Sequence, residues 1–370
     1  EISGFESFPS SQKSLLRPDP YFPTRAPRAY GVWHMAVSAL SYARRALEEA
    51  VTRKRDRSVA AIRPTPHAKP VPSVLRRHEV EHWELLTADA EHSSQGYLPF
   101  RVVKPVGGGA EGRRLPTVIM LHPTGADQDY HVGWEAKLVD RGFLTVSLDL
   151  RYHGSRQDDA VTYQEAIRRS YADESFAEKP FLLDNVWDLQ HVLDVLENRP
   201  DVGKIGITGL SLGGMVSWLL AVVDNRVYAP APLCGVQSFR YAIENNQFHE
   251  RAMSIPEVFR AASPDGILSN LTPELVARVW RTLLPGLLEH YDAAMSLGCI
   301  APRPLLVVTG SLDGRNPVQG VKEAVDAARV AYEEQGVGDR LELFAQEDAG
   351  HELTPLMRDT IDNWFDRWLV

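Results

Sequence analysis

A serine between two glycines is the residue of this chain that most clearly points to chemistry. Ser211 lies in the run Gly209-Leu210-Ser211-Leu212-Gly213, after a β-branched apolar stretch at 205–208 and before a helix-competent stretch at 215–223. A sharp strand-to-helix turn strains such a serine, and the glycines avoid a collision across the turn. The hydroxyl then lies beside a helix N-terminus, which favours a developing negative charge. The pattern predicts a nucleophile; the alternative is an ordinary glycine-rich turn.

An acid and a base follow this serine at the ends of two later strand patterns. Asp313 comes directly after the apolar pattern at 304–310, and His351 follows the alternating pattern at 340–346. Parallel strands bring such positions to one edge of a sheet, where ligands bind. A serine hydroxyl must lose its proton as it attacks. We therefore expect His351 to accept that proton and Asp313 to orient the imidazole and stabilise its charged form.

Other residues compete for these two roles. Asp313 could instead cap a helix that begins near Pro317, and Asp348 is a second acid in the loop of the histidine itself. His122 and His153 also lie near predicted strand ends, but neither follows the last strand. The chain order therefore favours Ser211, Asp313 and His351.

Two backbone N–H groups are expected to stabilise the oxyanion of such a reaction. One belongs to Leu212, the residue after the nucleophile, and the other to the loop after the strand pattern at 117–121. Because Pro123 has no N–H, Thr124 is the predicted second donor. Arg151, after a further strand pattern at 143–150, is expected to bind a carboxylate with two hydrogen bonds and brace the loop of Thr124.

The stretch 237–300 is longer than a simple connection between two strands needs. Its pattern predicts helices at 239–247, 255–262 and 272–290, which would form a cap inserted before the strand that carries the acid. Its aromatic side chains either line an apolar substrate pocket or form the core of the cap. A substrate of small to medium size and partly hydrophobic character is expected rather than a long polysaccharide. The predicted substrate contacts are Tyr152, Phe239, Tyr241, Trp280 and Tyr291.

Together these motifs resemble the α/β-hydrolases, in the dienelactone hydrolase-like branch that also holds acetyl xylan esterase-like and prolyl oligopeptidase-like domains. The likeness covers residues ~80–370. Dienelactone hydrolases carry cysteine at the nucleophile position, so serine here favours ordinary ester cleavage. The matching runs are 121–125, 149–155, 184–189, 209–214, 235–240, 301–304 and 350–351.

The resemblance implies a mostly parallel central sheet flanked by helices. We expect a hydrolase core at 79–236 and 301–370, the helical cap at 237–300 and a separate extension at 1–78. The extension reads as Pro-rich coil, a helix from Trp33 to Arg53, and a linker with several prolines. The narrow apolar stripe of that helix either packs on the hydrolase or pairs two copies in a homodimer. A third interpretation is that the extension is the remnant of an organelle-targeting segment.

Composition limits the partners of the chain. Its net charge is −9, but residues 1–78 carry 14 Lys and Arg against 6 Asp and Glu, and the remainder carries 26 against 43. Because residues 79–370 are so acidic, we do not expect them to bind nucleic acid or an anionic membrane surface. The two cysteines exclude a disulfide scaffold, and no apolar run is long enough to span a bilayer. No cofactor or metal is expected, and the expected location is cytoplasmic or in an organelle lumen rather than secreted.

These observations predict a serine hydrolase that cleaves carboxylic esters through an acyl-enzyme. Thioester cleavage, acyl transfer and a lyase step could use the same residues, because fold and site do not fix the substrate. The alternative outside the enzymes is a ligand receptor that has the hydrolase fold but no catalytic activity.

Overall fold

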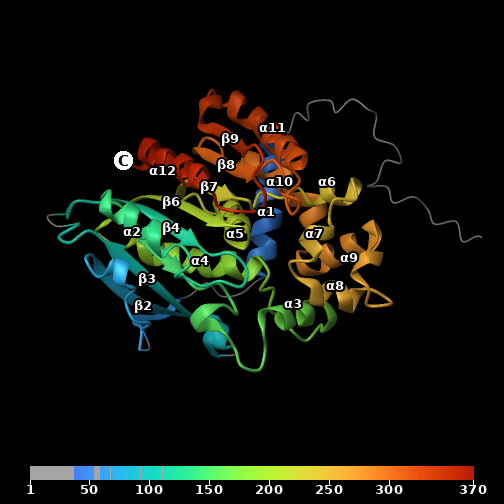
Figure 1. The fold of residues 1–370 in the computed structure, drawn as a ribbon, viewed down its shortest axis with the longest axis horizontal. Coiled ribbons are helices and arrows are strands. Elements are labelled where there is room, and N and C mark those ends of the chain that lie inside the picture. The colour runs from blue at the N-terminus through green and yellow to red at the C-terminus, as the bar shows by residue number, and fades with distance from the viewer. Residues whose placement is uncertain (1–36, 54–58, 67, 92, 110–111) are drawn as a thin grey trace, which may run out of the picture. The chain divides into compact units, whose positions relative to one another are not determined.

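The described residues of the computed structural model, 37–53, 59–66, 68–91, 93–109 and 112–370, form one sheet covered by helices (Figure 1). Nine strands lie in the order β1-β2-β3-β5-β4-β6-β7-β8-β9. From β5 to β9 all neighbours are parallel. The strands are β1 (Val59–Pro64), β2 (Glu79–Thr87), β3 (Tyr97–Lys104), β4 (Leu115–Leu121), β5 (Leu144–Leu148), β6 (Val202–Leu210), β7 (Val227–Leu233), β8 (Leu305–Gly310) and β9 (Leu341–Gln346).

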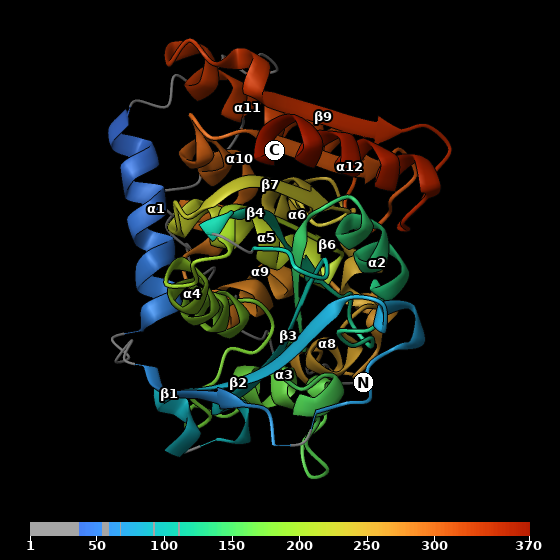
Figure 2. The same ribbon diagram turned by 90° about the vertical axis from the view of Figure 1, so that its left-hand side faces the viewer.

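Helices cover both faces of the parallel part of the sheet, because these strands are apolar on both faces. In β4, for example, the neighbouring residues Val118 and Ile119 belong to two different buried clusters, one on each face. Helices α2 (Val132–Asp140) and α12 (Pro355–Leu369) cover the face of Val118, and α4 (Leu183–Glu197), α5 (Leu212–Val223) and α11 (Val318–Glu334) cover the other. Figure 2 shows the sheet between α4 and α2.

The first three strands are antiparallel and extend the sheet on one side. Strand β1 lies within the predicted 1–78 extension, yet it pairs with β2 from Ala61↔Leu86 to Pro64↔Trp83. The expected boundary at residue 78 therefore separates two paired strands of one sheet. By this pairing, residues 59–64 belong to the hydrolase domain and not to a separate extension. The sequence did not predict this strand because it is short, ends at Pro64 and has no clear alternation of apolar and polar residues. Only its pairing with β2 identifies it as a strand.

The connection from β7 to β8 is the predicted helical cap. It holds α6 (Phe239–Glu244), α7 (His249–Ala252), α8 (Pro256–Ala262), α9 (Pro273–Leu283) and α10 (Ala293–Ser296). The predicted helix at 272–290 is shorter than expected, because Pro285 and Gly286, with φ 84°, interrupt it before a π-helical turn at Leu287–Tyr291. Helix α3 (Tyr163–Ala172), which precedes the cap in the chain, packs against α8 and α9 (Figure 1).

The predicted N-terminal helix is present as α1 (Val37–Thr52), which stands beside α4 and α10 in Figure 2. Its apolar stripe is covered by the chain itself: Leu47 and Val51 are fully buried, and Cys299 Sγ donates to the carbonyl of Leu40 at 3.1 Å. Packing on the hydrolase is thus the role that the structure gives this face. The homodimer stays a prediction, and the predicted coil before this helix lies outside the described residues.

Candidate active site

The turn between β6 and α5 holds Ser211 in a strained conformation. Its φ and ψ are 59° and −109°, in a region that non-glycine residues rarely adopt. The flanking glycines leave no room for a side chain. A Cβ at Gly209 would lie 2.6 Å from the carbonyl oxygen of Leu121, and a Cβ at Gly213 would lie 2.5 Å from the same oxygen. The close approach of β4 to this turn therefore requires glycine on both sides of the serine.

The structure brings Ser211, His351 and Asp313 into one hydrogen-bonded chain. The Ser211 hydroxyl lies 2.8 Å from His351 Nε2, and His351 Nδ1 lies 2.9 Å from both carboxylate oxygens of Asp313. These residues come from the end of β6, the loop after β8 and the loop after β9. The geometry fixes the imidazole with Nδ1–H donating to Asp313 and Nε2 accepting from the serine.

The alternative roles considered for this site do not match the geometry. Helix α11 begins at Val318 with Pro317 at its N-cap position, so Asp313 does not cap it. Asp348 is exposed, and both Nδ1 contacts of the imidazole go to Asp313. The ring of His122 lies between the carbonyl of Pro123 and the N–H of Leu150, where it ties two loops together.

Burial and hydrogen bonding set the protonation of this chain. Burial lowers the pKa of His351 below its ordinary value, although Asp313 opposes this. Burial alone would raise the pKa of Asp313, but hydrogen bonds from His351 and Asn316 outweigh it and hold that pKa below the usual range. At neutral pH the site therefore holds a neutral imidazole next to a carboxylate, which is the state in which a histidine can accept a proton.

Asn316, which the sequence analysis missed, supports the acid. Its backbone N–H donates to Asp313 Oδ1 at 3.0 Å, and its Nδ2 donates to Oδ2 at 2.9 Å and to the carbonyl of Cys234 at 2.7 Å. The side chain is fully buried. The available signal was its position just after the predicted acid, because an Asp side chain in a turn accepts from backbone N–H groups that follow it, here those of Arg315 and Asn316.

The two predicted oxyanion donors lie at the ends of neighbouring strands. Leu212 is the first residue of α5, and Thr124 lies in the turn after β4, the strand whose Leu121 contacts the serine turn. Neither N–H has an acceptor among the described residues. Both groups are therefore available to a ligand.

Asp149 and Arg151 divide the bracing role that the sequence analysis gave to Arg151. The predicted two-point contact is present, from Arg151 to Asp188 at 2.9 and 2.8 Å. The loop after β4 is held instead by Asp149, which accepts from the N–H of Gln128 at 2.7 Å. Arg151 points toward α4 because Asp188 and Asp184 lie there, and this part of the prediction was wrong.

The five predicted substrate contacts separate into two groups. The hydroxyl of Tyr152 donates to Glu178 at 3.0 Å, and that of Tyr291 donates to the carbonyl of Pro285 at 3.0 Å. Trp280 packs against Phe181, Phe239 and Phe259 with ring centroids 5.0 to 5.7 Å apart. These four side chains, Tyr152, Phe239, Trp280 and Tyr291, are buried, which argues for packing rather than substrate contact.

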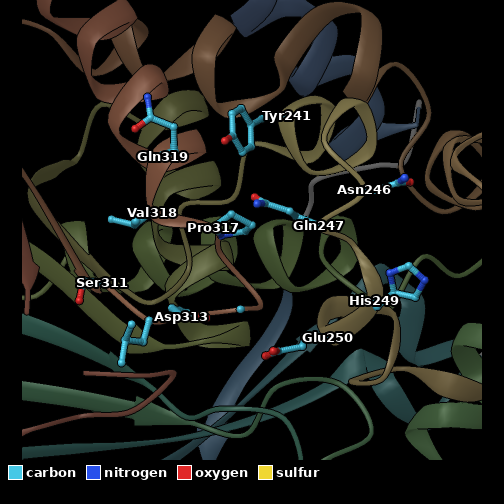
Figure 3. A pocket seen from close by; sticks show the side chains of 12 residues that line it. Tyr241, Asn246, Gln247, His249, Glu250, Ser311, Asp313, Pro317, Val318 and Gln319 are labelled. Carbon is cyan, nitrogen blue, oxygen red and sulfur yellow. The ribbon is translucent and has the colours of Figure 1, made fainter. Parts of the chain in front are cut away.

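Tyr241 differs, because it lines a hollow of about 450 Å³ between the cap and the loop after β8. Figure 3 shows Tyr241, Gln247 and Glu250 on the cap side and Asp313 and Pro317 on the loop side. Ser211 and His351 are absent from this lining. The hollow therefore reaches the site from the side of the acid.

Cys234 lies next to the acid and the imidazole but stays protonated. Its Sγ, an Asp313 oxygen and a His351 nitrogen lie within 4.8 Å of one another, the one group of possible metal ligands that the described residues form. Burial raises the pKa of the Cys234 thiol to about 12. Because Asp313 and His351 bind each other, their geometry fits the proton relay. The other cysteine, Cys299, is also buried and free.

The model of the alpha/beta hydrolase family matches residues 118–362, which contain the serine turn and both partner residues. The chain belongs to the alpha/beta hydrolase family. This chain is 25% identical over 186 residues to the Bacillus subtilis (strain 168) protein named "Putative hydrolase YtaP". The match covers 50% of the chain and 53% of YtaP, about half of each.

Solved structures of esterases share this fold. An acetyl xylan esterase of Thermoanaerobacterium sp. JW/SL YS485 aligns with a TM-score of 0.58 and 18% identity, over 88% of this chain and 92% of that one. An acetyl xylan esterase of Paenibacillus sp. R4 aligns with a TM-score of 0.57 and 16% identity, over 90% and 95%. At these identities the likeness concerns the fold. No helix among the described residues has the length and apolar character that crossing a membrane requires.

Proposed function

We propose that this alpha/beta hydrolase cleaves carboxylic esters through an acyl-enzyme formed on Ser211. The observation that carries the proposal is the hydrogen-bonded chain in which the Ser211 hydroxyl lies 2.8 Å from a His351 ring that Asp313 holds at 2.9 Å. The strained turn at Ser211 adds to it. The esterase names of the similar structures are consistent with this chemistry.

The reaction follows from the direction of these hydrogen bonds. The Ser211 oxygen attacks the ester carbonyl as its proton passes to His351 Nε2, and Asp313 stabilises the imidazolium. The oxyanion accepts from the N–H groups of Leu212 and Thr124, and each such donor is worth about 10²–10³-fold in rate. The imidazolium then protonates the leaving alcohol. Water attacks the acyl-enzyme with His351 as base, which releases the acid and restores the serine.

Covalent labelling tests the nucleophile directly. A fluorophosphonate probe followed by intact mass measurement is expected to add one group to the protein, at Ser211, and 4-nitrophenyl esters of short acids are expected to be hydrolysed. Ser211→Ala should remove both signals and leave the fold intact. The matched control is Ser217→Ala, which removes a buried hydroxyl of the same helix that donates to the carbonyl of Gly213 at 2.7 Å.

The outcomes distinguish the candidate functions. Wild-type esterase activity in Ser211→Ala would overturn the mechanism. A folded protein that neither binds the probe nor cleaves esters would favour the receptor alternative. Labelling without net ester hydrolysis, together with transfer of the acyl group to an added alcohol or thiol, would favour acyl transfer.

A further inference from the structure

Arg251, on helix α7 of the cap, is a buried cation without a carboxylate partner. Among the described residues, four arginines including Arg251 are buried, and the other three pair with acids. Arg101 binds Glu135 at 2.6 Å, and Arg151 and Arg156 both bind Asp188 at 2.8 Å. Arg251 is only 1% exposed and has no ion pair with any described residue. Burying a guanidinium in this state is costly unless a ligand supplies the missing charge.

Among the described residues, the guanidinium of Arg251 makes one hydrogen bond, and it leads directly to the candidate active site. Its Nη2 donates to Asn316 Oδ1 at 2.9 Å, and the amide nitrogen of Asn316 lies 2.9 Å from Asp313 and 3.5 Å from His351 Nδ1. Its Nε is buried without a hydrogen-bond partner among the described residues. Burial lowers the pKa of Arg251 to about 10, so the group stays charged at neutral pH. Asp313, the nearest source of compensation, already accepts from His351 and Asn316.

A second buried polar group lies on helix α3. The Tyr163 hydroxyl, at the start of α3, is buried and has no well-formed hydrogen bond within the described part of the chain. It interacts with the side-chain hydroxyl of Thr124, whose backbone N–H is the predicted oxyanion donor, and it lies within electrostatic reach of Arg251. Helix α3 is joined to the turn that follows α7, because Gln164 Nε2 donates to the carbonyl of Ser254 at 3.2 Å. A fixed cation and a hydroxyl donor thus flank the same site.

We propose that Arg251 and Tyr163 form a subsite for a carboxylate on the ester substrate. This inference rests on the proposed function and names the substrate class. A guanidinium and a phenol hydroxyl both donate to a carboxylate, and in a buried site these charge-assisted bonds are strong. A neutral substrate would leave the guanidinium without a carboxylate in direct contact. The enzyme therefore selects monoesters of dicarboxylic acids, or esters of alcohols that carry an acid group, over their neutral counterparts.

Two pairs of matched esters test this selection and locate the carboxylate. The first pair is 4-nitrophenyl hydrogen adipate and 4-nitrophenyl hexanoate, which differ on the acyl side. The second is 4-acetoxybenzoate and 4-methylphenyl acetate, which differ on the alcohol side. The measured quantity is the ratio of kcat/KM for the anionic ester to that for the neutral ester. In at least one pair, Arg251→Met should lower this ratio about 10- to 100-fold. Tyr163→Phe should lower the same ratio by a smaller factor.

The ratio of the two kcat/KM values separates loss of carboxylate recognition from damage to the hydrogen-bonded chain of Asp313, His351 and Ser211. Because Arg251 also contacts Asn316, its loss is expected to slow both esters, but a purely structural role would slow them equally. Arg240→Met removes the same charge from an exposed cap position and should leave the ratio unchanged. Arg251→Lys keeps a cation and should recover part of the preference. A measurement on the wild type needs no variant: adipate should inhibit hexanoate ester cleavage competitively, and hexanamide should not.

Three results would overturn the subsite. These are equal ratios in wild type and Arg251→Met for both pairs, a preference lost equally in Arg240→Met, or inhibition by hexanamide as strong as by adipate. In each case hydrolysis of the neutral esters at Ser211 would still stand. Absence of ester cleavage in the wild type would instead overturn the proposed function.

Discussion

Asn316 holds Asp313 at two points, with its backbone N–H 3.0 Å from one carboxylate oxygen and its side-chain Nδ2 2.9 Å from the other. The carboxylate in turn holds the His351 ring. The angle at which the imidazole meets Ser211 therefore depends on a residue that touches no reacting atom. Asn316 is a positioning residue in this arrangement.

Asn316→Ala is expected to lower kcat by up to about 10²-fold with little change in KM, because it loosens the acid and misplaces the imidazole without touching the substrate. Steady-state kinetics with a neutral ester checks this. Asn316→Asp places a second carboxylate against Asp313 and should be worse than alanine. A loss confined to KM would contradict the positioning role.

The pH dependence of kcat/KM should report His351. The imidazole accepts a proton only when neutral, so activity rises as pH increases through its pKa, which burial places below the ordinary value. The acidic limb is therefore expected below the usual histidine range, and activity should persist into mildly acidic buffer. In Asp313→Asn the influence that raises this pKa is lost, so the limb should move to still lower pH while kcat falls by about 10⁴-fold.

Asp348→Asn is the matched control for that experiment. Asp348 is the second acid of the same region, but it is exposed and the imidazole binds Asp313. Its profile should overlay that of the wild type. A limb that moved equally in both variants would show that general surface charge sets the profile.

The serine turn depends on the two glycines beside it. A Cβ at Gly213 would lie 2.5 Å from the carbonyl oxygen of Leu121, so Gly213→Ala must push β4 and α5 apart. We expect a loss of about 1–3 kcal/mol in the free energy of unfolding and a large fall in kcat. In Gly133→Ala, on helix α2, the new Cβ meets nothing within 4 Å, and this control should keep activity and gain slightly in stability. Urea unfolding of both variants measures the difference.

Arg151 is expected to matter for stability rather than for chemistry. It is fully buried and pairs with Asp188 at 2.8 Å and Asp184 at 3.3 Å, so Arg151→Met removes one of the two cations that each buried carboxylate contacts and leaves only Arg156 on Asp188 and Arg53 on Asp184. The expected loss is about 3–5 kcal/mol. Arg168→Met breaks a surface pair with Glu165 and should change stability by less than about 1 kcal/mol. Equal losses would contradict the importance of burial.

The sequence predicted the parts of this protein whose signals are local. Strand β7 begins and ends where its apolar run does, and the serine turn, with the loops of Asp313 and His351, follows from strand-end positions. Strand β1 was missed because only its pairing with β2 defines it. Arg251 was missed for a related reason. Its burial and its hydrogen bond to Asn316 depend on how the cap packs against the loop after β8, and no periodicity in the sequence connects these two segments. The aromatic cap residues were predicted as a group, but which of them pack together depends on the fold.

Helix α1 offers a test that separates packing on its own chain from the predicted homodimer contact. Leu47 is fully buried against the chain itself, so Leu47→Ala should lower the free energy of unfolding by about 2–5 kcal/mol. Glu49→Ala, on the exposed side of the same helix, should have little effect. If α1 serves only to pack on its own chain, the mass measured by light scattering is the same for both variants and the wild type. A mass that falls in Leu47→Ala at unchanged stability would instead support a homodimer through this helix.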